Sequence, residues 1–323
     1  MDEKLIQLQG VTKRFGKNTV FDSIDLDIPE GKITGIIGAS GEGKSTMLKM
    51  IASFYKPTSG KILYSNKDIF KEIKNIKRLF GFAIEDGSFY EDLTVKENLL
   101  YFGRLYHVKK SMLLPRIEGL MHFVSLINAK DVLAKNLSLG MKKRLDIACS
   151  LVHKPSVLIL DEPTADLDPL LRFQIIKLIK KINYHGTTIV FTTQILNEAD
   201  EICDKIVILY NEKIIDQTSS SKIKTKYNSS DLDEVFRKIF SKKGRKTYQE
   251  SVKKKTILKD GILEVENNLP LKKGFLEEQD GELKIAKKGI EEVFLSNKIK
   301  KFEFLKKIKN KFFPEMKNSK KKK

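Results

Sequence analysis

The sequence has few features of a membrane-spanning, secreted or metal-binding protein. No apolar run approaches the ~18 residues that a membrane-spanning helix needs. The first residues do not show the basic-then-apolar pattern of a secretory signal peptide. Cys149 and Cys203 are the only cysteines, and neither has another Cys or a His at metal-ligand spacing. We therefore expect no membrane span and no signal peptide, and two buried thiols in a reducing compartment.

Acidic residues are also scarce relative to basic ones, and the imbalance is uneven. The 323 residues include 61 Lys and Arg against 42 Asp and Glu, a formal net charge of +19. Residues 241–323 contain 25 of those basic residues and 12 of the acidic ones, a net charge of +13. The basic character therefore belongs mainly to the C-terminal part. The length suits one large α/β domain with an appendage, or two modest domains.

One glycine-rich stretch fits the pattern G-x-x-x-x-G-K-[ST], which binds nucleotide phosphates. A short apolar run at residues 33–37 predicts a buried strand before it, and residues 45–54 predict a helix after it. Glycines let successive N–H groups point at phosphate oxygens, and the helix N-terminus adds partial positive charge. A tight turn before a core helix is the alternative. The context favours a nucleoside triphosphate site made of Gly38, Ala39, Ser40, Gly41, Glu42, Gly43, Lys44, Ser45 and Thr46.

The remaining pattern predicts an α/β fold with a mostly parallel sheet. Residues 5–11 and 20–28 alternate apolar and polar side chains, as half-exposed antiparallel strands do. Residues 94–153 show long helical patterns and little strand signal, which indicates a helical insertion. After it, the pattern predicts strands and helices in alternation, which is typical of a covered parallel sheet: strands at 157–160, 187–191 and 205–210, helices at 169–184 and 195–202.

An apolar run that ends in Asp161 and Glu162 predicts the second half of the nucleotide site. An acid at the end of a buried strand beside a phosphate loop can hold Mg²⁺, together with the Ser45 hydroxyl. The adjacent Glu162 is placed to polarise the attacking water as a general base. Lys44 would reach the β- and γ-phosphates.

Three motifs in this order resemble the ATP-binding subunits of ABC transporters: the phosphate loop, the segment 136–144 and the segment 161–169. The resemblance covers roughly residues 3–217. It implies that two such subunits clamp two ATP molecules head to tail. Ser138 and Gly140 would then bind the γ-phosphate of the partner's ATP, and Asp168 would lie in the loop that communicates across the dimer. Phe15 stands where the family places an aromatic under the adenine; packing at a strand end is the alternative.

The signature Leu-Ser-Leu-Gly-Met at residues 137–141 resembles the branch that exports antibiotics, lipids and polysaccharides. Residues 93–106 and the acidic-aromatic segment 232–236 agree with that branch. The resemblance implies a P-loop ATPase that drives a separate membrane permease, paired with a second ATP-binding subunit, identical or different. It also implies a cytoplasmic protein on the inner face of the cell membrane.

Two positions depart from the family pattern. Glu85 replaces the usual Gln, and Gln194 replaces the usual His that contacts the γ-phosphate. Gln194 can donate a hydrogen bond but cannot carry a proton. A charge ~6 Å from Glu85 at an effective dielectric of ~20 interacts by about 3 kcal/mol, and we expect Glu85 to contact Mg²⁺. The hypothesis is slow but real hydrolysis. The alternatives are a degenerate half of a heterodimer, a regulatory ATP-binding module and a soluble ABC-type ATPase without a transporter.

The predicted domain organisation follows from these boundaries. Residues 1–220 form the ATP-binding domain, with a helical subdomain at about 86–153. Residues 221–255 form a helix and a basic linker, and residues 256–323 form a small basic α+β accessory region with short strands around 256–289, a helix at 290–313 and a Lys-rich end. A packed mini-domain, attraction to an anionic membrane and nucleic-acid binding compete for this tail. Nucleic acid is the weakest of the three, because no recognition motif accompanies the charge.

Overall fold

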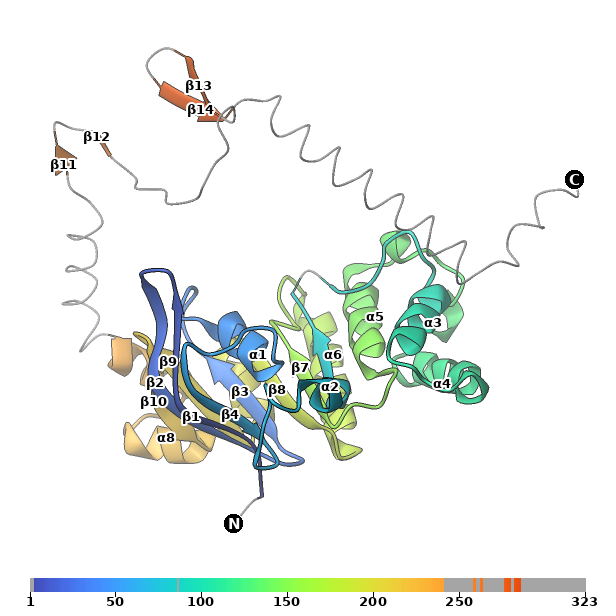
Figure 1. Ribbon diagram of the computed structural model, residues 1–323, viewed down its shortest axis with the longest axis horizontal. Helices are drawn as coiled ribbons and strands as arrows, with labels where there is room; N and C mark the ends of the chain where they lie inside the picture. The colour runs from blue at the N-terminus through green and yellow to red at the C-terminus, as the bar shows by residue number, and fades with distance from the viewer. Residues whose placement is uncertain are drawn as a thin grey trace, which may run out of the picture. The chain divides into compact units, whose positions relative to one another are not determined.

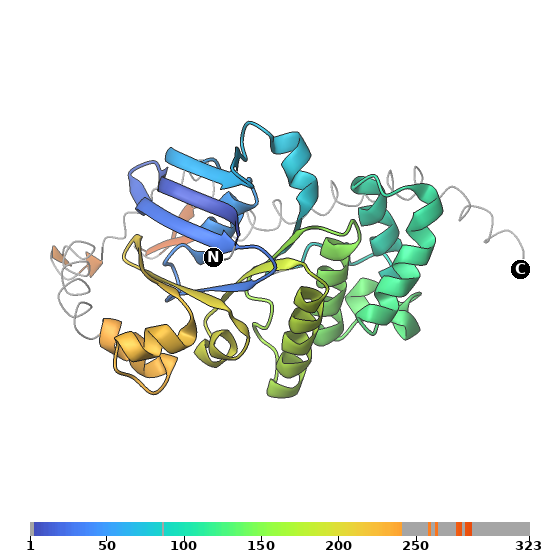
Figure 2. The ribbon, with the colours of Figure 1, turned by 90° about the horizontal axis from the view of Figure 1, so that it is seen from below.

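The computed structural model describes residues 3–85 and 87–240, together with four short strands between residues 258 and 285. The chain divides into two units, Met1–Lys243 and Gly244–Lys323. The first unit contains two sheets and the helices that cover them (Figures 1 and 2). None of the helices in the described residues is long and apolar enough to cross a membrane.

The N-terminal sheet is antiparallel, with strand order β2-β1-β4-β5. Its strands are β1 (Lys4–Phe15), β2 (Asn18–Pro29), β4 (Ser59–Tyr64) and β5 (Lys67–Asp68). Apolar side chains of β1 and β2 point inward at alternate positions, as the sequence pattern predicts, and Ile6, Leu8, Leu26 and Ile28 are almost fully buried. The two predicted antiparallel strands are confirmed and are longer than predicted.

The second sheet has the order β10-β9-β3-β8-β7-β6, and only β10 is antiparallel to its neighbour. Its strands are β3 (Ile33–Ile37), β6 (Phe80–Ala83), β7 (Val157–Leu160), β8 (Thr188–Thr193), β9 (Lys205–Tyr210) and β10 (Lys213–Thr218). The predicted α/β fold with a mostly parallel sheet is therefore confirmed. The carboxyl ends of β3, β7 and β8 meet at one edge, where ligands bind in such sheets.

Helices cover both faces of this sheet. On one face, α1 (Lys44–Ile51) packs between the two sheets with Val157 and Ile159, while Leu158 and Leu160 point to the other face. That second face carries α5 (Leu139–Leu151) and α6 (Pro169–Tyr184). Three further helices pack on the strands β3 and β9: α7 (Leu196–Ile202), α8 (Ser220–Lys226) and the helix at 232–240. Because the side chains of β7 alternate between two covered faces, all four of its residues are apolar.

The predicted helical insertion is present as α3 (Val95–Leu105), α4 (Lys110–Phe123) and α5. Thr94 and Glu97 form a capping box at the start of α3, which fixes where the helix begins. The short helices are α2 (Ile73–Ile76), η1 (Lys77–Leu79), η2 (Ile127–Ala129) and η3 (Ala134–Asn136).

One helix boundary was predicted wrongly. The helix after the phosphate loop ends at Ile51 rather than at residue 54, because Ser53 adopts a left-handed backbone conformation with φ of 60°. Phe54 is consequently 58 % exposed instead of lying on the buried helix face.

In the second unit the described residues form two antiparallel hairpins, β11 (Leu258–Lys259) with β12 (Ile262–Leu263) and β13 (Leu276–Gln279) with β14 (Glu282–Ile285). These are strands of the kind predicted for residues 256–289. The predicted helix at 290–313 and the Lys-rich end lie outside the described residues.

Candidate nucleotide site

The phosphate loop connects β3 to α1, as the motif requires. Gly41 and Gly43 have φ of 86° and 87°, a region that side chains other than glycine rarely adopt. A Cβ at Gly43 would also lie 2.6 Å from Val20 Cγ1 and 2.8 Å from Phe21 Cζ. Gly43 caps α1 with no side chain, so the first N–H groups of the helix face the loop. These features form a cradle for an anion at a helix N-terminus.

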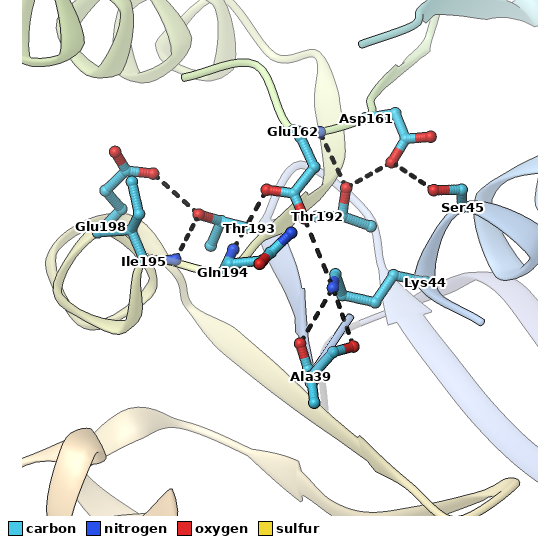
Figure 3. A network of polar contacts seen from close by, with 11 residues as sticks. Ala39, Lys44, Ser45, Asp161, Glu162, Thr192, Thr193, Gln194, Ile195 and Glu198 are labelled. Carbon is cyan, nitrogen blue, oxygen red and sulfur yellow. Dashed lines mark hydrogen bonds and ion pairs between the residues drawn. The ribbon is translucent and has the colours of Figure 1, made fainter. Parts of the chain in front are cut away.

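Lys44 is the charged group of this cradle and is only 7 % exposed. Its Nζ donates to the carbonyl oxygens of Gly38 at 3.0 Å and Ala39 at 3.2 Å. The same Nζ lies 3.5 Å from Oε1 of Glu162 (Figure 3). Among the residues that the structure describes, that oxygen accepts no hydrogen bond. A buried ammonium beside an unsatisfied carboxylate oxygen fits a site for phosphate and attacking water.

Asp161 and Ser45 meet although 116 positions separate them in the chain. The Ser45 hydroxyl donates to Asp161 Oδ1 at 3.1 Å, and the Thr192 hydroxyl donates to the same oxygen at 2.7 Å (Figure 3). Mg²⁺ prefers such hard oxygen ligands, usually one or two from the protein together with substrate phosphates. The residues present therefore fit Mg-ATP.

Glu162 lies directly after β7 and is held from two sides. Its backbone N–H donates to the Thr192 hydroxyl at 2.9 Å, and its Oε2 accepts from the backbone N–H of Gln194 at 3.2 Å. Its φ of 47° is left-handed, which is uncommon for a residue other than glycine. The structure thus brings Glu162 and Gln194 together. The Gln194 side chain is exposed at the end of β8.

Ser138 and Gly140 begin α5, away from the phosphate loop; in Figure 1, α1 and α5 lie on either side of β7. The Ser138 hydroxyl caps the helix by accepting from the Met141 N–H at 3.4 Å. Ser138 is exposed, and so is Leu139 beside it, at 45 %. Within the part of the chain that the structure describes, no hydrogen bond or ion pair joins Ser138 to the phosphate loop. Ser138 and Leu139 therefore face solvent within one chain, whereas Gly140 is buried.

The other predicted residues occupy different positions around the site. Asp168 caps α6 by accepting from the N–H groups of Leu170 at 2.9 Å and Leu171 at 3.0 Å. Phe15 ends β1 with 45 % exposure, edge-on to Tyr55, with Lys13 Nζ 4.5 Å above its ring. The Phe15 ring is therefore packed against an aromatic neighbour and partly exposed.

Glu85 is exposed and lines a hollow of about 240 Å³ with residues of α5, including Leu139 and Lys143. The Lys143 Nζ donates to the Glu85 backbone carbonyl at 2.8 Å. Among the described residues, no hydrogen bond or ion pair joins the Glu85 carboxylate to Ser45 or Asp161. The predicted metal contact of Glu85 stays a prediction.

Sequence patterns missed the threonines that hold the acidic residues in place. Thr192 and Thr193 follow the apolar residues 189–191 at the end of β8 and are completely buried. Buried polar side chains need hydrogen-bond partners, so two threonines that follow an apolar run in a predicted strand could have indicated this role. Thr192 connects Asp161 to the Glu162 backbone, while the Thr193 hydroxyl donates to Glu198 Oε2 at 3.0 Å.

Comparisons with known proteins agree with this site. The family model described as ABC transporter matches residues 21–165. The chain is 31 % identical to the daunorubicin resistance ATP-binding protein DrrA3 of Streptomyces coeruleorubidus, covering 73 % of this chain and 75 % of that one. It is 31 % identical to the Nod factor export ATP-binding protein I of Ralstonia nicotianae, with 72 % of each covered. The methionine import ATP-binding protein MetN of Histophilus somni is 35 % identical, with 68 % and 66 % covered.

The fold has matching solved structures as well. A structure described as the ATP binding subunit of an ABC transporter is 25 % identical with a TM-score of 0.66, covering 72 % of this chain and 98 % of that one. Sequence, fold and site geometry agree on the same identity. The chain therefore belongs to the ATP-binding subunits of ABC transporters, which are ATPases that bind ATP with Mg²⁺ and work with membrane permease subunits.

Proposed function

We propose that this chain forms one half of a two-protomer ATPase in which each ATP lies between the phosphate loop of one subunit and Ser138 and Gly140 of the other. The observation that carries the proposal is that the phosphate loop and the N-terminus of α5 lie apart within one chain. Lys44, Glu162 and Gln194 form a connected group, whereas Ser138 is the exposed N-cap of α5 elsewhere in the chain. Helix N-termini bind anions, so the start of α5 is suited to a γ-phosphate supplied by a partner.

Each residue near the phosphates has a distinct proposed role. The backbone from Gly38 to Thr46 and the Lys44 ammonium bind the phosphates, and Phe15 stacks on the adenine. Ser45 and Asp161 hold Mg²⁺, which when bound neutralises phosphate charge. Glu162 takes a proton from the attacking water through Oε1, which among the described residues accepts no hydrogen bond. The Gln194 amide donates to the γ-phosphate.

Export is the proposed direction of transport. The Leu-Ser-Leu-Gly-Met signature supports it, as does the similarity to the Nod factor export protein. A methionine import protein is also similar, so the family alone does not decide the direction. We propose that the permease is a separate chain and that this subunit lies on the cytoplasmic face of the cell membrane. The proposed domains are residues 1–220, 221–255 and 256–323. Attraction to anionic lipid is a proposed role of the basic tail.

A slow or degenerate partner in a heterodimer is the second candidate. Gln194 cannot carry charge, and the Glu85 carboxylate has no contact with the proposed metal residues among the described residues. Both observations favour a reduced hydrolysis rate. They leave the cradle around Lys44 unchanged, so ATP binding is expected in either case.

Glu162→Gln tests the proposal, because it keeps the shape of the side chain and removes the base. Gel filtration with and without Mg-ATP, together with phosphate release with the permease present, gives the two readouts. We expect ATP-dependent dimers of the variant and loss of phosphate release. Monomers that pair only with a different ATPase subunit would support the heterodimer. Phosphate release that does not depend on Glu162 would refute the proposed mechanism.

A further inference from the structure

Glu198 lies on α7, outside the motifs of the nucleotide site, yet it is only 5 % exposed. Burial raises the pKa of its carboxyl group, and hydrogen bonds from two hydroxyls oppose that shift. A buried carboxylate is costly unless it is paired and hydrogen-bonded. The partners of Glu198 therefore indicate what it is for.

One carboxylate oxygen joins two loops that leave the sheet at different strands. Oε2 accepts from the Thr164 hydroxyl at 2.7 Å and from the Thr193 hydroxyl at 3.0 Å. Thr164 follows β7, two residues after Glu162. Thr193 ends β8, immediately before Gln194. The hydroxyl of Thr193 also accepts from the Ile195 N–H at 3.0 Å (Figure 3). The residues on either side of Gln194 are therefore both held by the Thr193 hydroxyl.

The second carboxylate oxygen extends the connection toward Asp168. Oε1 lies 3.3 Å from Arg172 Nε on α6, although the two atoms are not aligned for a hydrogen bond. Arg172 Nη2 donates to the Leu167 carbonyl at 3.2 Å, next to Asp168. The Arg172 guanidinium also offsets the repulsion between the carboxylates of Glu198 and Glu162.

From these contacts we infer that Glu198 is a positioning residue for ATP turnover, which fixes the loop with Glu162 and Asp168 relative to the loop with Gln194. It does so through Thr164, Thr193 and Arg172 and does not itself touch ATP. The inference rests on the proposed roles of Glu162 and Gln194. General-base geometry tolerates little displacement, so the separation of these loops controls the chemical step. ATP binding depends on the phosphate loop, which Glu198 does not contact in the described residues.

Glu198→Gln in the full-length chain, assayed with the permease, tests this role. The amide keeps the size of the side chain but presents an NH₂ group to Arg172 or to a hydroxyl. We expect kcat to fall at least tenfold, about 1.4 kcal/mol in the barrier, with KM for ATP unchanged. Glu201→Gln is the matched control, because Glu201 lies on the same helix with a 50 % exposed side chain paired with Lys180.

A second variant separates positioning from folding. Glu198→Asp keeps the charge but withdraws the carboxylate by one methylene, so we expect the same fall in kcat with a melting temperature near that of the wild type. Hydrogen exchange gives a readout independent of turnover. Faster exchange of residues 163–168 and 193–195 in Glu198→Gln, but not in Glu201→Gln, is expected.

Two outcomes would overturn the inference, and a third concerns the proposed function. Wild-type kcat in Glu198→Gln, in a preparation where Glu162→Gln abolishes turnover, would refute positioning. So would unchanged exchange in both loops. Turnover that survives Glu162→Gln would instead contradict the proposed mechanism and leave the exchange experiment as the test of Glu198.

Discussion

Asp146, which is buried in α5, has a raised pKa, and His153, which is half-buried just after α5, has a lowered pKa. These shifts predict how stability depends on pH. Burial raises the pKa of Asp146 to about 6, and burial lowers the pKa of His153 to about 4. Asp146 accepts from the Ser88 N–H at 2.6 Å, and this hydrogen bond and the charge of Lys143 partly oppose the rise of its pKa. His153 stacks on Tyr106 with ring centroids 3.7 Å apart, and its Nε2 lies 3.0 Å from the Phe80 carbonyl oxygen.

The signs follow from which state binds more protons. Unfolded His153 takes up a proton near its ordinary pKa of 6.5, before the folded form does, so stability is lost as the pH falls from about 6.5 to 4. Folded Asp146 takes up a proton first, so stability is gained as the pH falls from about 6 to 3.8. Between pH 7 and 5 the linkage gives a loss of about 2 kcal/mol from His153 and a gain of about 1 kcal/mol from Asp146.

Substitution of either residue should therefore remove its own contribution to the pH dependence of the unfolding free energy and leave that of the other. Asp146→Asn keeps an acceptor for Ser88 but cannot titrate, so the free energy of unfolding should fall by about 1 kcal/mol more than that of the wild type between pH 7 and 5. His153→Gln keeps an N–H donor for Phe80 and should lose about 2 kcal/mol less. Urea denaturation at pH 7, 6 and 5 measures these differences, and all other titrating groups cancel between variants. Parallel pH curves for the three proteins would refute the reasoning.

Two further variants concern the nucleotide site. Gly43→Ala should weaken ATP binding at least tenfold in an equilibrium titration, because φ is 87° and the new Cβ meets Val20 and Phe21. Gly119→Ala is the control and should bind ATP normally, because a Cβ there has nothing within 4 Å. Thr192→Val should lower kcat about tenfold, since it removes the hydroxyl that joins Asp161 to the Glu162 backbone. The exposed Thr225→Val serves as its control in the phosphate-release assay, and equal rates for both threonine variants would contradict the role of Thr192.

Features that depend on one continuous segment could be predicted from the sequence. The phosphate loop, β7 and α6 each carry their own signal: a fixed motif, four apolar residues in a row, or an Asp cap before Pro169. The strands β6 and β10 were not predicted. The strand β6 has four residues including Gly81, and β10 is a mostly polar edge strand, so neither shows a clear alternation.

Features made by contacts between distant segments could not be predicted from the sequence. Glu198 appears in the sequence as an ordinary charged residue on a short helix, yet its partners come from positions 164, 172 and 193. The end of α1 shows the same limit on a smaller scale. The apolar spacing continues to Phe54, but the backbone turns at Ser53, and periodicity does not report such a turn.

The two parts of the nucleotide site are built from different kinds of structure, and this bears on the substitutions at 85 and 194. In the proposed mechanism, binding rests on backbone N–H groups and on Lys44, which the chain fixes within a single loop and helix start. Turnover, in the same proposal, rests on side chains at the ends of β7 and β8, held by Thr192, Thr193 and Glu198 across the sheet. Because a changed side chain at residue 85 or 194 lies outside the backbone cradle, it can alter the rate without altering affinity. A subunit of this construction can therefore retain ATP-driven pairing while its hydrolysis rate diverges from that of a partner.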